Sequence, residues 1–504
     1  MTLVYQIDYL LFLQEIKIMR KFTVLLFAFV CVGIGKVTGQ YSILINFNDS
    51  IIPQGTSPNG SLTLLGNKLY GITSDITSNF PGNIFSVDTN GFGYSNLYDF
   101  NDTTGDYPAG EALTLFGNKF YGMTNLGGTQ GVGVIFSIDT NGRGYKVLLN
   151  FNDTNGGNPT GSLIYSGGTL YGKTGQGGTK DDGVCFSIDT SGSGYKDLLN
   201  FNDTNGFYAY GTLTRSGNRL FGTTEQGGPY IYYGCIFSIN TDGSGYKNLF
   251  YFNDTNGALP VSLLTLSGGV LYGMTKGGGL NHDGVVFSID TNGNGYKKLL
   301  DFNGTNGEAP WGALILSGSV LYGMTSAGGA YNYGLVFSID TNGTGYKALF
   351  DFNGPNGAYP YGNLTLSGNE LYGMTHAGGT NNGGVVFRLN YVTAGINKLT
   401  SDLNVITIFP NPSIGIFTIT NVGAQNFVPE KIEVFNVLGE QVLKQIPVRT
   451  VHPGGLRSSQ PARTGTGGDD KVIDLTMQPN GIYFYRVVAE DGSIAGEGKL
   501  VIQK

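Results

Sequence analysis

Short apolar segments separated by Gly, Asn and Asp recur through residues 41–390. The copy that runs from Gly161 to Phe201 shows the plan. Four of its segments read as strands, which we name A to D in chain order: Ser162–Ser166, Thr169–Thr174, Val184–Asp189 and Tyr195–Phe201. Glycine and Asn occupy the intervening turns because a positive φ costs them little. We therefore expect an all-β domain built from four-stranded units.

Two motifs give the period of these units. The aromatic residue of a Leu-Tyr-Gly motif recurs every 50 or 51 residues, at Tyr70, Tyr121, Tyr171, Phe221, Tyr272, Tyr322 and Tyr372. A Phe-Ser-Ile-Asp motif keeps the same step, starting at Phe85, Phe136, Phe186, Phe237, Phe287, Phe337 and Phe387. Seven copies of about 50 residues with four strands each predict a seven-bladed β-propeller over residues 40–390.

The two ends of the repeat region favour a closed ring. The last copy stops at Phe387–Asn390 and has no strand D, whereas Tyr41–Phe47 is a lone strand of the D type. Insertion of this N-terminal strand into the last blade would complete the seventh sheet and leave no exposed sheet edge. The alternative is an open β-solenoid, which should carry atypical capping repeats and would leave the N-terminal strand unexplained.

Residues 1–39 read as an upstream segment and a secretory signal. Met19-Arg20-Lys21 precedes an apolar run, Phe22–Gly35, and a small-residue site follows before Gln40. This is the plan of a signal peptide, and the run is too short to span a bilayer. We expect export to the periplasm and no transmembrane span in the mature chain. Translation from Met1 and from Met19 both remain open.

Composition argues against a nucleic-acid partner, and the positions of the cysteines argue against a disulfide. A net charge of −7 with 13% charged residues offers no basic stripe, so nucleic acid is not an expected partner. The aromatic content of 12% argues against disorder. Cys185 and Cys235 lie in neighbouring copies, one residue out of register. Their side chains should point to opposite faces, which predicts two buried thiols and no disulfide.

The chain changes character after residue 390. Residues 391–402 read as a linker, and residues 403–504 as a small immunoglobulin-like β-sandwich of about seven strands. Residues 447–470 form an insertion rich in Pro, Gly, Ser and Thr, which we expect to be mobile.

The repeats resemble the GloVer tandem repeat of exported bacterial proteins. The resemblance lies in Leu-Tyr-Gly-Met-Thr-x-x-Gly-Gly, Gly-Val-Val-Phe-Ser-Ile-Asp-Thr-Asn-Gly and Tyr-Lys-x-Leu-x-x-Phe, and covers nearly all of residues 41–390. The first copy departs from it, because Ser74–Asn79 lacks the Gly-Gly pair. The resemblance implies export and a propeller-like fold, and it assigns no activity.

About the last hundred residues resemble the type A sorting domain of the type IX secretion system. The matching positions include Pro410, Asn411, Pro412, Gly439, Gly481, Tyr483 and Lys499. The resemblance implies that the type IX machinery is a partner and carries the chain across the outer membrane. Removal of the domain would then leave a product that is released or attached to the cell surface.

Comparison of the copies points to one face as the binding face. The A–B and C–D turns are nearly identical from copy to copy, whereas the D–A and B–C loops vary. Repeat proteins place function on variable loops of one face. The candidate ligand-binding residues are Tyr208, Tyr210, Tyr232, Tyr233, His282, Asp283, Trp311, Tyr331, Tyr333, Tyr359 and Tyr361. The alternative is that these rings only wedge between blades.

The sequence offers no assignable catalytic group. None of the three His residues has zinc-ligand spacing, and we expect neither metal nor cofactor. Candidate carboxylates are repeated turn residues or single loop residues, so no pair for sugar hydrolysis can be chosen. The leading hypothesis is a non-catalytic binding module for a glycan or a protein. A propeller-type polysaccharide-degrading enzyme, glycosidase or lyase, and a structural surface protein remain the alternatives.

Overall fold

The computed structural model describes residues 41–48, 55–74, 81–108, 112–391, 405–409, 413–422, 431–436, 441–443, 471–488 and 494–504. The predicted signal segment, the insertion at 447–470 and the linker, apart from Tyr391, lie outside these residues. So do four of the predicted sorting residues, Pro410, Asn411, Pro412 and Gly439. The chain divides into two compact units, Met1–Val392 and Thr393–Lys504. Within the described residues, no helix has the length and apolar character needed to cross a membrane.

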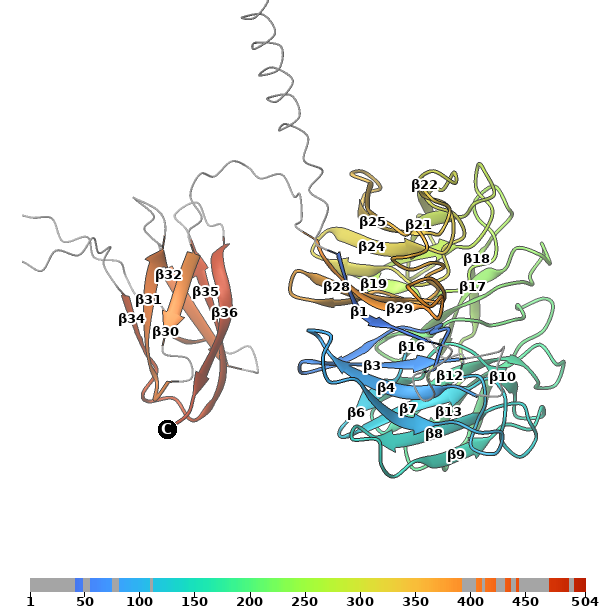
Figure 1. Ribbon diagram of the computed structural model, residues 1–504, viewed down its shortest axis with the longest axis horizontal. Coiled ribbons are helices and arrows are strands. Elements are labelled where there is room, and N and C mark those ends of the chain that lie inside the picture. Colours follow the sequence, from blue (N-terminus) through green and yellow to red (C-terminus); the bar gives the residue numbers. More distant parts are fainter. Residues whose placement is uncertain are drawn as a thin grey trace, which may run out of the picture. The chain divides into compact units, whose positions relative to one another are not determined.

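The first unit contains seven antiparallel sheets, and each takes one strand of every type A to D (Figure 1). The A strands are Thr63–Leu65 (β2), Thr114–Phe116 (β6), Ile164–Ser166 (β11), Thr214–Ser216 (β15), Thr265–Ser267 (β19), Ile315–Ser317 (β23) and Thr365–Ser367 (β27). The B strands are Lys68–Thr73 (β3), Lys119–Thr124 (β7), Thr169–Gln176 (β12), Arg219–Thr224 (β16), Val270–Thr275 (β20), Val320–Thr325 (β24) and Glu370–Thr375 (β28).

The outer half of each blade completes the set. The C strands are Asn83–Asp88 (β4), Val134–Asp139 (β8), Val184–Asp189 (β13), Cys235–Asn240 (β17), Val285–Asp290 (β21), Leu335–Asp340 (β25) and Val385–Asn390 (β29). The D strands are Ser95–Asp99 (β5), Lys146–Asn150 (β9), Lys196–Asn200 (β14), Lys247–Tyr251 (β18), Lys297–Asp301 (β22) and Lys347–Asp351 (β26). A short extra strand, Gly157–Pro159 (β10), pairs with β12 in the third blade.

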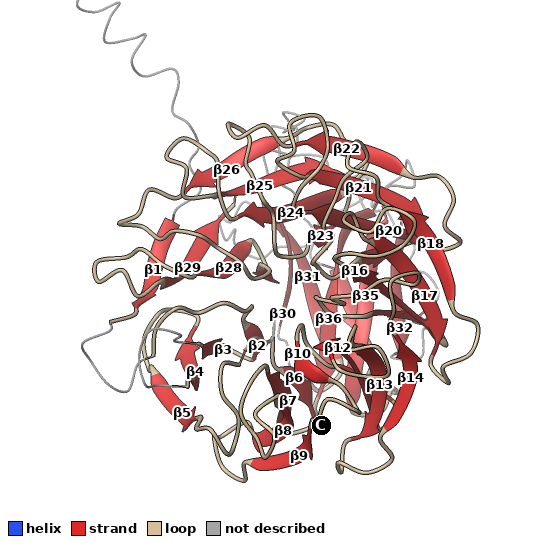
Figure 2. Ribbon diagram, turned by 90° about the vertical axis from the view of Figure 1, so that its right-hand side faces the viewer, coloured by secondary structure: helices blue, strands red, loops and turns tan. Residues whose placement is uncertain are grey.

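The N-terminal strand Tyr41–Asn46 (β1) closes the ring. It pairs antiparallel with β29, from Tyr41 opposite Leu389 to Asn46 opposite Val385, and so becomes strand D of the seventh blade (Figure 2). Where the seventh blade meets the first, the Thr365 hydroxyl donates a hydrogen bond of 2.6 Å to the Leu62 carbonyl of the first blade. The prediction of a closed seven-bladed propeller is confirmed, and the open solenoid is wrong for this chain.

The core lies between neighbouring blades, and it explains the repeated motifs. Ile45, Phe47 and Val386 of the seventh blade share one buried cluster with Phe85 and Val87 of the first. The glycine of the Leu-Tyr-Gly motif is needed for packing, because a Cβ at Gly71 would lie 2.5 Å from the Phe85 ring. The motif residues therefore interlock face to face within and between sheets.

The inner strands are shorter than the pattern predicts. Strand A of the third blade begins at Ile164 and not at Ser162. The Ser162 amide donates to the Thr212 hydroxyl of the next blade at 2.6 Å, so this residue links two blades and does not extend a sheet. Cys185 and Cys235 are both buried free thiols, as predicted.

The second unit is a pair of sheets around its own core. One sheet contains Val405–Phe409 (β30), Ile416–Val422 (β31) and Lys471–Asp474 (β34). The other contains Lys431–Asn436 (β32), Gln441–Leu443 (β33), Gly481–Val488 (β35) and Ile494–Ile502 (β36). Phe417 and Ile473 of the first sheet pack against Val434 and Leu500 of the second. Among the predicted sorting residues, Tyr483 is buried in this core.

Candidate functional site

The variable loops lie together at one face of the propeller. In six blades, the residue that follows strand B donates its amide to a carbonyl of the D–A loop of the same blade, as Glu225 does to Tyr208 at 2.9 Å and His376 to Tyr359 at 3.1 Å. The C–D turns contact the A–B turns at the other end, as Thr89 does with Asn67. The two loop types are therefore sorted onto opposite faces, as the sequence predicts.

A backbone feature repeated in all seven D–A loops aims their side chains. One residue in each loop has a positive φ between 49° and 57°: Ser57, Tyr107, Asn158, Tyr208, Leu259, Ala309 and Tyr359. This left-handed conformation is uncommon for residues other than glycine, and is costliest for bulky side chains. In the described loops, the residue two positions later lines the axial cavity, as Tyr210 does after Tyr208.

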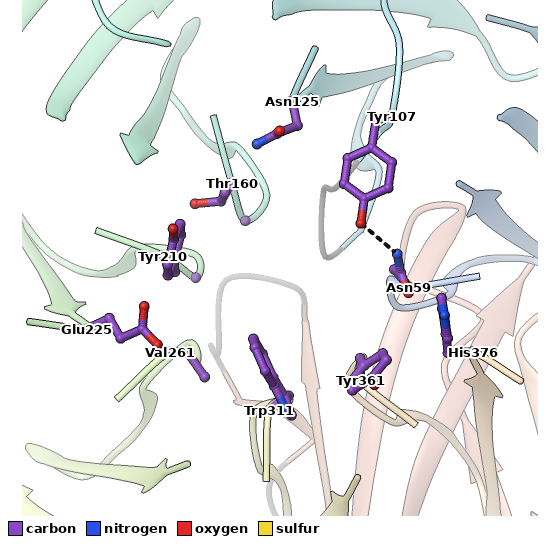
Figure 3. Close-up of a pocket in the computed structure, with 12 residues that line it drawn as sticks. Asn59, Tyr107, Asn125, Thr160, Tyr210, Glu225, Val261, Trp311, Tyr361 and His376 are labelled. Carbon is purple, nitrogen blue, oxygen red and sulfur yellow. Dashed lines mark hydrogen bonds between the residues drawn. The ribbon is translucent and has the colours of Figure 1, made fainter. Parts of the chain in front are cut away.

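These residues enclose a cavity of about 610 Å³, which we call the axial pocket (Figure 3). It is lined by Asn59, Tyr107, Asn125, Thr160, Gly161, Tyr210, Gly211, Glu225, Val261, Trp311, Tyr361 and His376. All of them belong to D–A loops or directly follow strand B. The volume is within the range of small-molecule sites, and the lining combines rings with a few polar groups.

One side of the axial pocket is aromatic. The rings of Trp311 and Tyr361 meet edge to face, with centroids 5.6 Å apart, and the His376 ring lies 5.3 Å beyond Tyr361. Lys276 places its ammonium 4.0 Å from the centre of the Trp311 ring, a cation–π contact that orients the indole. The Trp311 side chain is therefore held in place and half-exposed to the cavity.

The rest of the lining mixes polar groups with the rings of Tyr107 and Tyr210. Burial raises the pKa of the Glu225 carboxyl above its usual value, and the Lys276 ammonium opposes that shift. Burial, with the nearby Glu225 carboxylate, raises the pKa of Tyr210 to about 12. Asn59 Oδ1 and Thr160 Oγ1 are buried and have no hydrogen-bond partner among the residues that the structure describes. Such atoms normally have a partner, so these two oxygens suit a polar ligand or water.

Lys173 is a buried residue that holds one of the pocket loops in place. It is 1% exposed, and its ammonium donates to the carbonyls of Tyr210 at 2.8 Å and Thr223 at 2.9 Å. The equivalent position of most other copies is apolar, as at Met123 and Met274. This buried ammonium ties the third blade to the loop that carries Tyr210.

The structure brings only some of the predicted binding residues together. Tyr210, Trp311 and Tyr361 line the axial pocket. Tyr208 stacks on Tyr210, with centroids 5.9 Å apart, and Tyr333 contacts Tyr359 at 5.6 Å.

The remaining predicted residues lie away from the pocket. Tyr232 and Tyr331 are exposed, whereas Tyr233 packs against an inter-blade core. His282 pairs with Asp254 at 3.1 Å, and the Asp283 carbonyl accepts the Ala309 amide.

Sequence reasoning missed the polar residues in and beside the pocket. Asn59, Asn125, Thr160, Glu225 and Lys276 were not among the candidates, although a signal for them exists. The residue after the motif Thr of strand B is Ser74, Asn125, Gly175, Glu225, Lys276, Ser326 or His376, although the motif around it is nearly constant. This variable position inside a constant motif contributes Asn125, Glu225 and His376 to the pocket lining.

The arrangement can hold a polar ligand against aromatic rings. Glu225 is the one carboxylate among the described lining residues, so they include no pair of carboxylates for sugar hydrolysis. No group of three or more His, Cys, Asp or Glu side chains that could hold a metal ion occurs among the residues that the structure describes.

Several solved structures are similar to this chain at low sequence identity. An oligogalacturonate lyase in complex with manganese is 12% identical, with a TM-score of 0.48, over 71% of this chain and 95% of that one. A GH74 enzyme of Niastella koreensis is 14% identical, with a TM-score of 0.48, over 77% of this chain and 60% of that one. A putative 6-phosphogluconolactonase of Bacteroides fragilis is 14% identical, with a TM-score of 0.41, over 77% of this chain and 96% of that one. All three TM-scores are below 0.5, so no property of these proteins is assigned to this chain.

Comparison with curated proteins gives no match. The model of the secretion system C-terminal sorting domain matches residues 407–452, in the second unit. The model of the Gloeobacter/Verrucomicrobia repeat matches residues 33–233 and 220–402, which together span most of the propeller. The propeller is thus a tandem array of this repeat, and the chain belongs to the Gloeobacter/Verrucomicrobia repeat family.

Proposed function

We propose that this protein is a secreted or surface-displayed glycan-binding module that holds a sugar unit in the axial pocket. The observation that carries the proposal is that the pocket lining combines aromatic rings, among them Trp311 and Tyr361, with polar groups such as Glu225. A pyranose ring has an apolar C–H face, which stacks on aromatic rings, and hydroxyl groups, which hydrogen-bond to carboxylates and amides.

The unpartnered oxygens strengthen the assignment to a glycan. Asn59 Oδ1 and Thr160 Oγ1 have no donor within the described part of the chain, and sugar hydroxyls would supply donors to both once the lining side chains shift to admit them. An unsatisfied buried acceptor costs about 1–3 kcal/mol. A ligand rich in hydroxyl groups is therefore favoured over an apolar ligand of the same size.

A glycan array with the purified propeller tests the proposal. We expect Trp311→Ala to weaken binding of array-positive glycans by about thirtyfold, equivalent to the loss of about 2 kcal/mol. Tyr232→Ala is the matched control, because Tyr232 is an exposed ring on the same face that does not line the pocket. Equal loss in both variants, or no bound glycan on the array, would contradict the proposal.

One observation favours a second function, a polysaccharide-degrading activity. Tyr361 and His376 lie in ring contact inside the pocket, and a Tyr with a His can exchange protons in a β-elimination. The array-positive glycan should then be converted into new reducing ends, and His376→Ala should abolish this turnover while glycan binding persists. Binding without product supports the non-catalytic module.

Export by type IX secretion is the proposed route to the ligand. The sorting-domain match supports it, and a ligand pocket on an exported protein would meet extracellular glycans. Deletion of residues 403–504 should leave the propeller in the periplasm, detected by cell fractionation. Release of the truncated chain into the medium at the wild-type level would contradict this route.

A further inference from the structure

We infer that the ligand is an extended, unbranched glycan that crosses the mouth of the axial pocket and contacts aromatic rings on both of its flanks. This inference rests on the proposed glycan-binding function and adds the shape of the ligand. It follows from two rows of rings that lead away from the pocket through different blades.

The first row runs outward from Tyr361. Tyr359 lies two residues earlier on the same loop, and its ring contacts Tyr333 at 5.6 Å. The Tyr359 amide donates to the Tyr333 carbonyl at 3.0 Å, which fixes the D–A loop of the seventh blade against the B–C loop of the sixth. Tyr333 and Tyr359 are 36% and 37% exposed, so both rings offer surface to a ligand.

The second row runs outward from Tyr210. Its ring is parallel to that of Tyr208 within 4° at 5.9 Å, and Tyr208 contacts Phe207 at 5.1 Å. The Phe207 amide and carbonyl both bond to Gln226 of the B–C loop, which holds the row in place. All three rings are half-buried.

The two rows lie on different sides of the cavity. Tyr210 belongs to the fourth blade and Tyr361 to the seventh, and in a ring of seven no two blades are further apart. Figure 3 shows the two residues across the cavity from each other. We call the rows together with Trp311 the aromatic track.

The two rows are built from equivalent loop positions. Tyr208 and Tyr359 occupy the equivalent left-handed position of their loops, with φ of 52° and 57°. All seven D–A loops share this conformation, so the repeat places the two tyrosines at matching points of their loops. A glycan suits the track better than a peptide, because the polar groups between its two rows include the neutral Asn59, Asn125 and Thr160.

Affinity as a function of chain length tests this inference. We would titrate the propeller with xylo-, laminari- and oligogalacturonate series from disaccharide to octasaccharide by calorimetry. The first-row variant is Tyr333→Ala with Tyr359→Ala, and the second-row variant is Phe207→Ala with Tyr208→Ala. The control variant is Tyr230→Ala with Tyr232→Ala, which removes two exposed rings outside the track. Thermal unfolding verifies that each variant is folded.

Each row variant should weaken octasaccharide binding by about tenfold and leave disaccharide binding within twofold, while the control changes neither. Loss in one row only would overturn the crossing geometry in favour of binding at a chain end. Unchanged octasaccharide affinity in both, with Trp311-dependent disaccharide binding intact, would overturn the track and leave the proposed function standing. Binding of a peptide in place of every oligosaccharide would overturn both.

Discussion

The hydroxyl of Tyr41 donates a hydrogen bond to the main-chain carbonyl of Asn356, 315 residues further along the chain. The Tyr41 ring stacks on Phe350 at 4.0 Å, in the way that Tyr296 stacks on Phe250 and donates to Asn256 in an interior blade. The N-terminal strand thus reproduces the side-chain contacts of an ordinary strand D at the one joint that is not covalently continuous.

Removal of the tyrosine at this joint should have an effect that removal of its counterpart in an interior blade does not have. Tyr41→Ala should lower the free energy of unfolding by about 3 kcal/mol through lost ring packing, and it should also promote aggregation by exposing the edge of β29. Tyr296→Ala should cost a similar free energy without that aggregation, because its strand is held from both ends. Chemical denaturation and light scattering would measure the two effects. Equal aggregation in both variants would contradict a special role for the joint.

The contact between the seventh and first blades gives a second prediction. A Cβ at Gly362 would lie 1.9 Å from the Gly60 carbonyl oxygen, so Gly362→Ala should lower the melting temperature by several degrees. Gly277→Ala is the control, because its Cβ would meet nothing closer than 3.7 Å and alanine occupies the equivalent positions 327 and 377. Equal melting temperatures for the two variants would show that the first and seventh blades do not pack this tightly.

Replacement of the buried Lys173 should increase the stability of the protein and weaken its glycan binding. Lys173→Met should raise the free energy of unfolding by about 1–2 kcal/mol, because methionine fits the same position elsewhere and a buried charge is costly. It should also weaken glycan binding, since the Tyr210 carbonyl loses its donor. Denaturant titration and calorimetry test the two parts. A variant that is more stable and binds glycan as tightly as the parent would show that Lys173 does not position the pocket.

Glu225 predicts a pH-dependent stability. Its pKa is raised by burial, so the folded protein holds this proton more tightly than the unfolded chain does. The stabilising contribution of the carboxyl is complete below the unfolded pKa of about 4.3 and is lost as the pH rises through the higher folded value. Glu225→Gln should therefore melt at a higher temperature than the parent at pH 7 and at the same temperature near pH 4. A lower melting temperature at pH 7 would contradict the raised pKa.

The sequence carries most of the fold and part of the site. Motif spacing predicts seven blades, and the orphan strand at Tyr41–Phe47 predicts the closure, because both depend on local patterns. The pocket is different, since it forms where equivalent loop positions converge on an axis. Trp311 and Tyr361 stand out as aromatic residues in variable loops, whereas Thr160 and Asn125 gain meaning only from that convergence. His282 lies on the predicted face, but its contact with Asp254 keeps it at the rim.

The most direct measurement uses the indole itself. Trp311 is the single tryptophan of the chain, so intrinsic tryptophan emission reports on the axial pocket alone. Titration with an array-positive oligosaccharide should change this emission saturably, with the dissociation constant found by calorimetry. Binding by calorimetry without any change in emission would place the ligand elsewhere and contradict the axial pocket as the binding site.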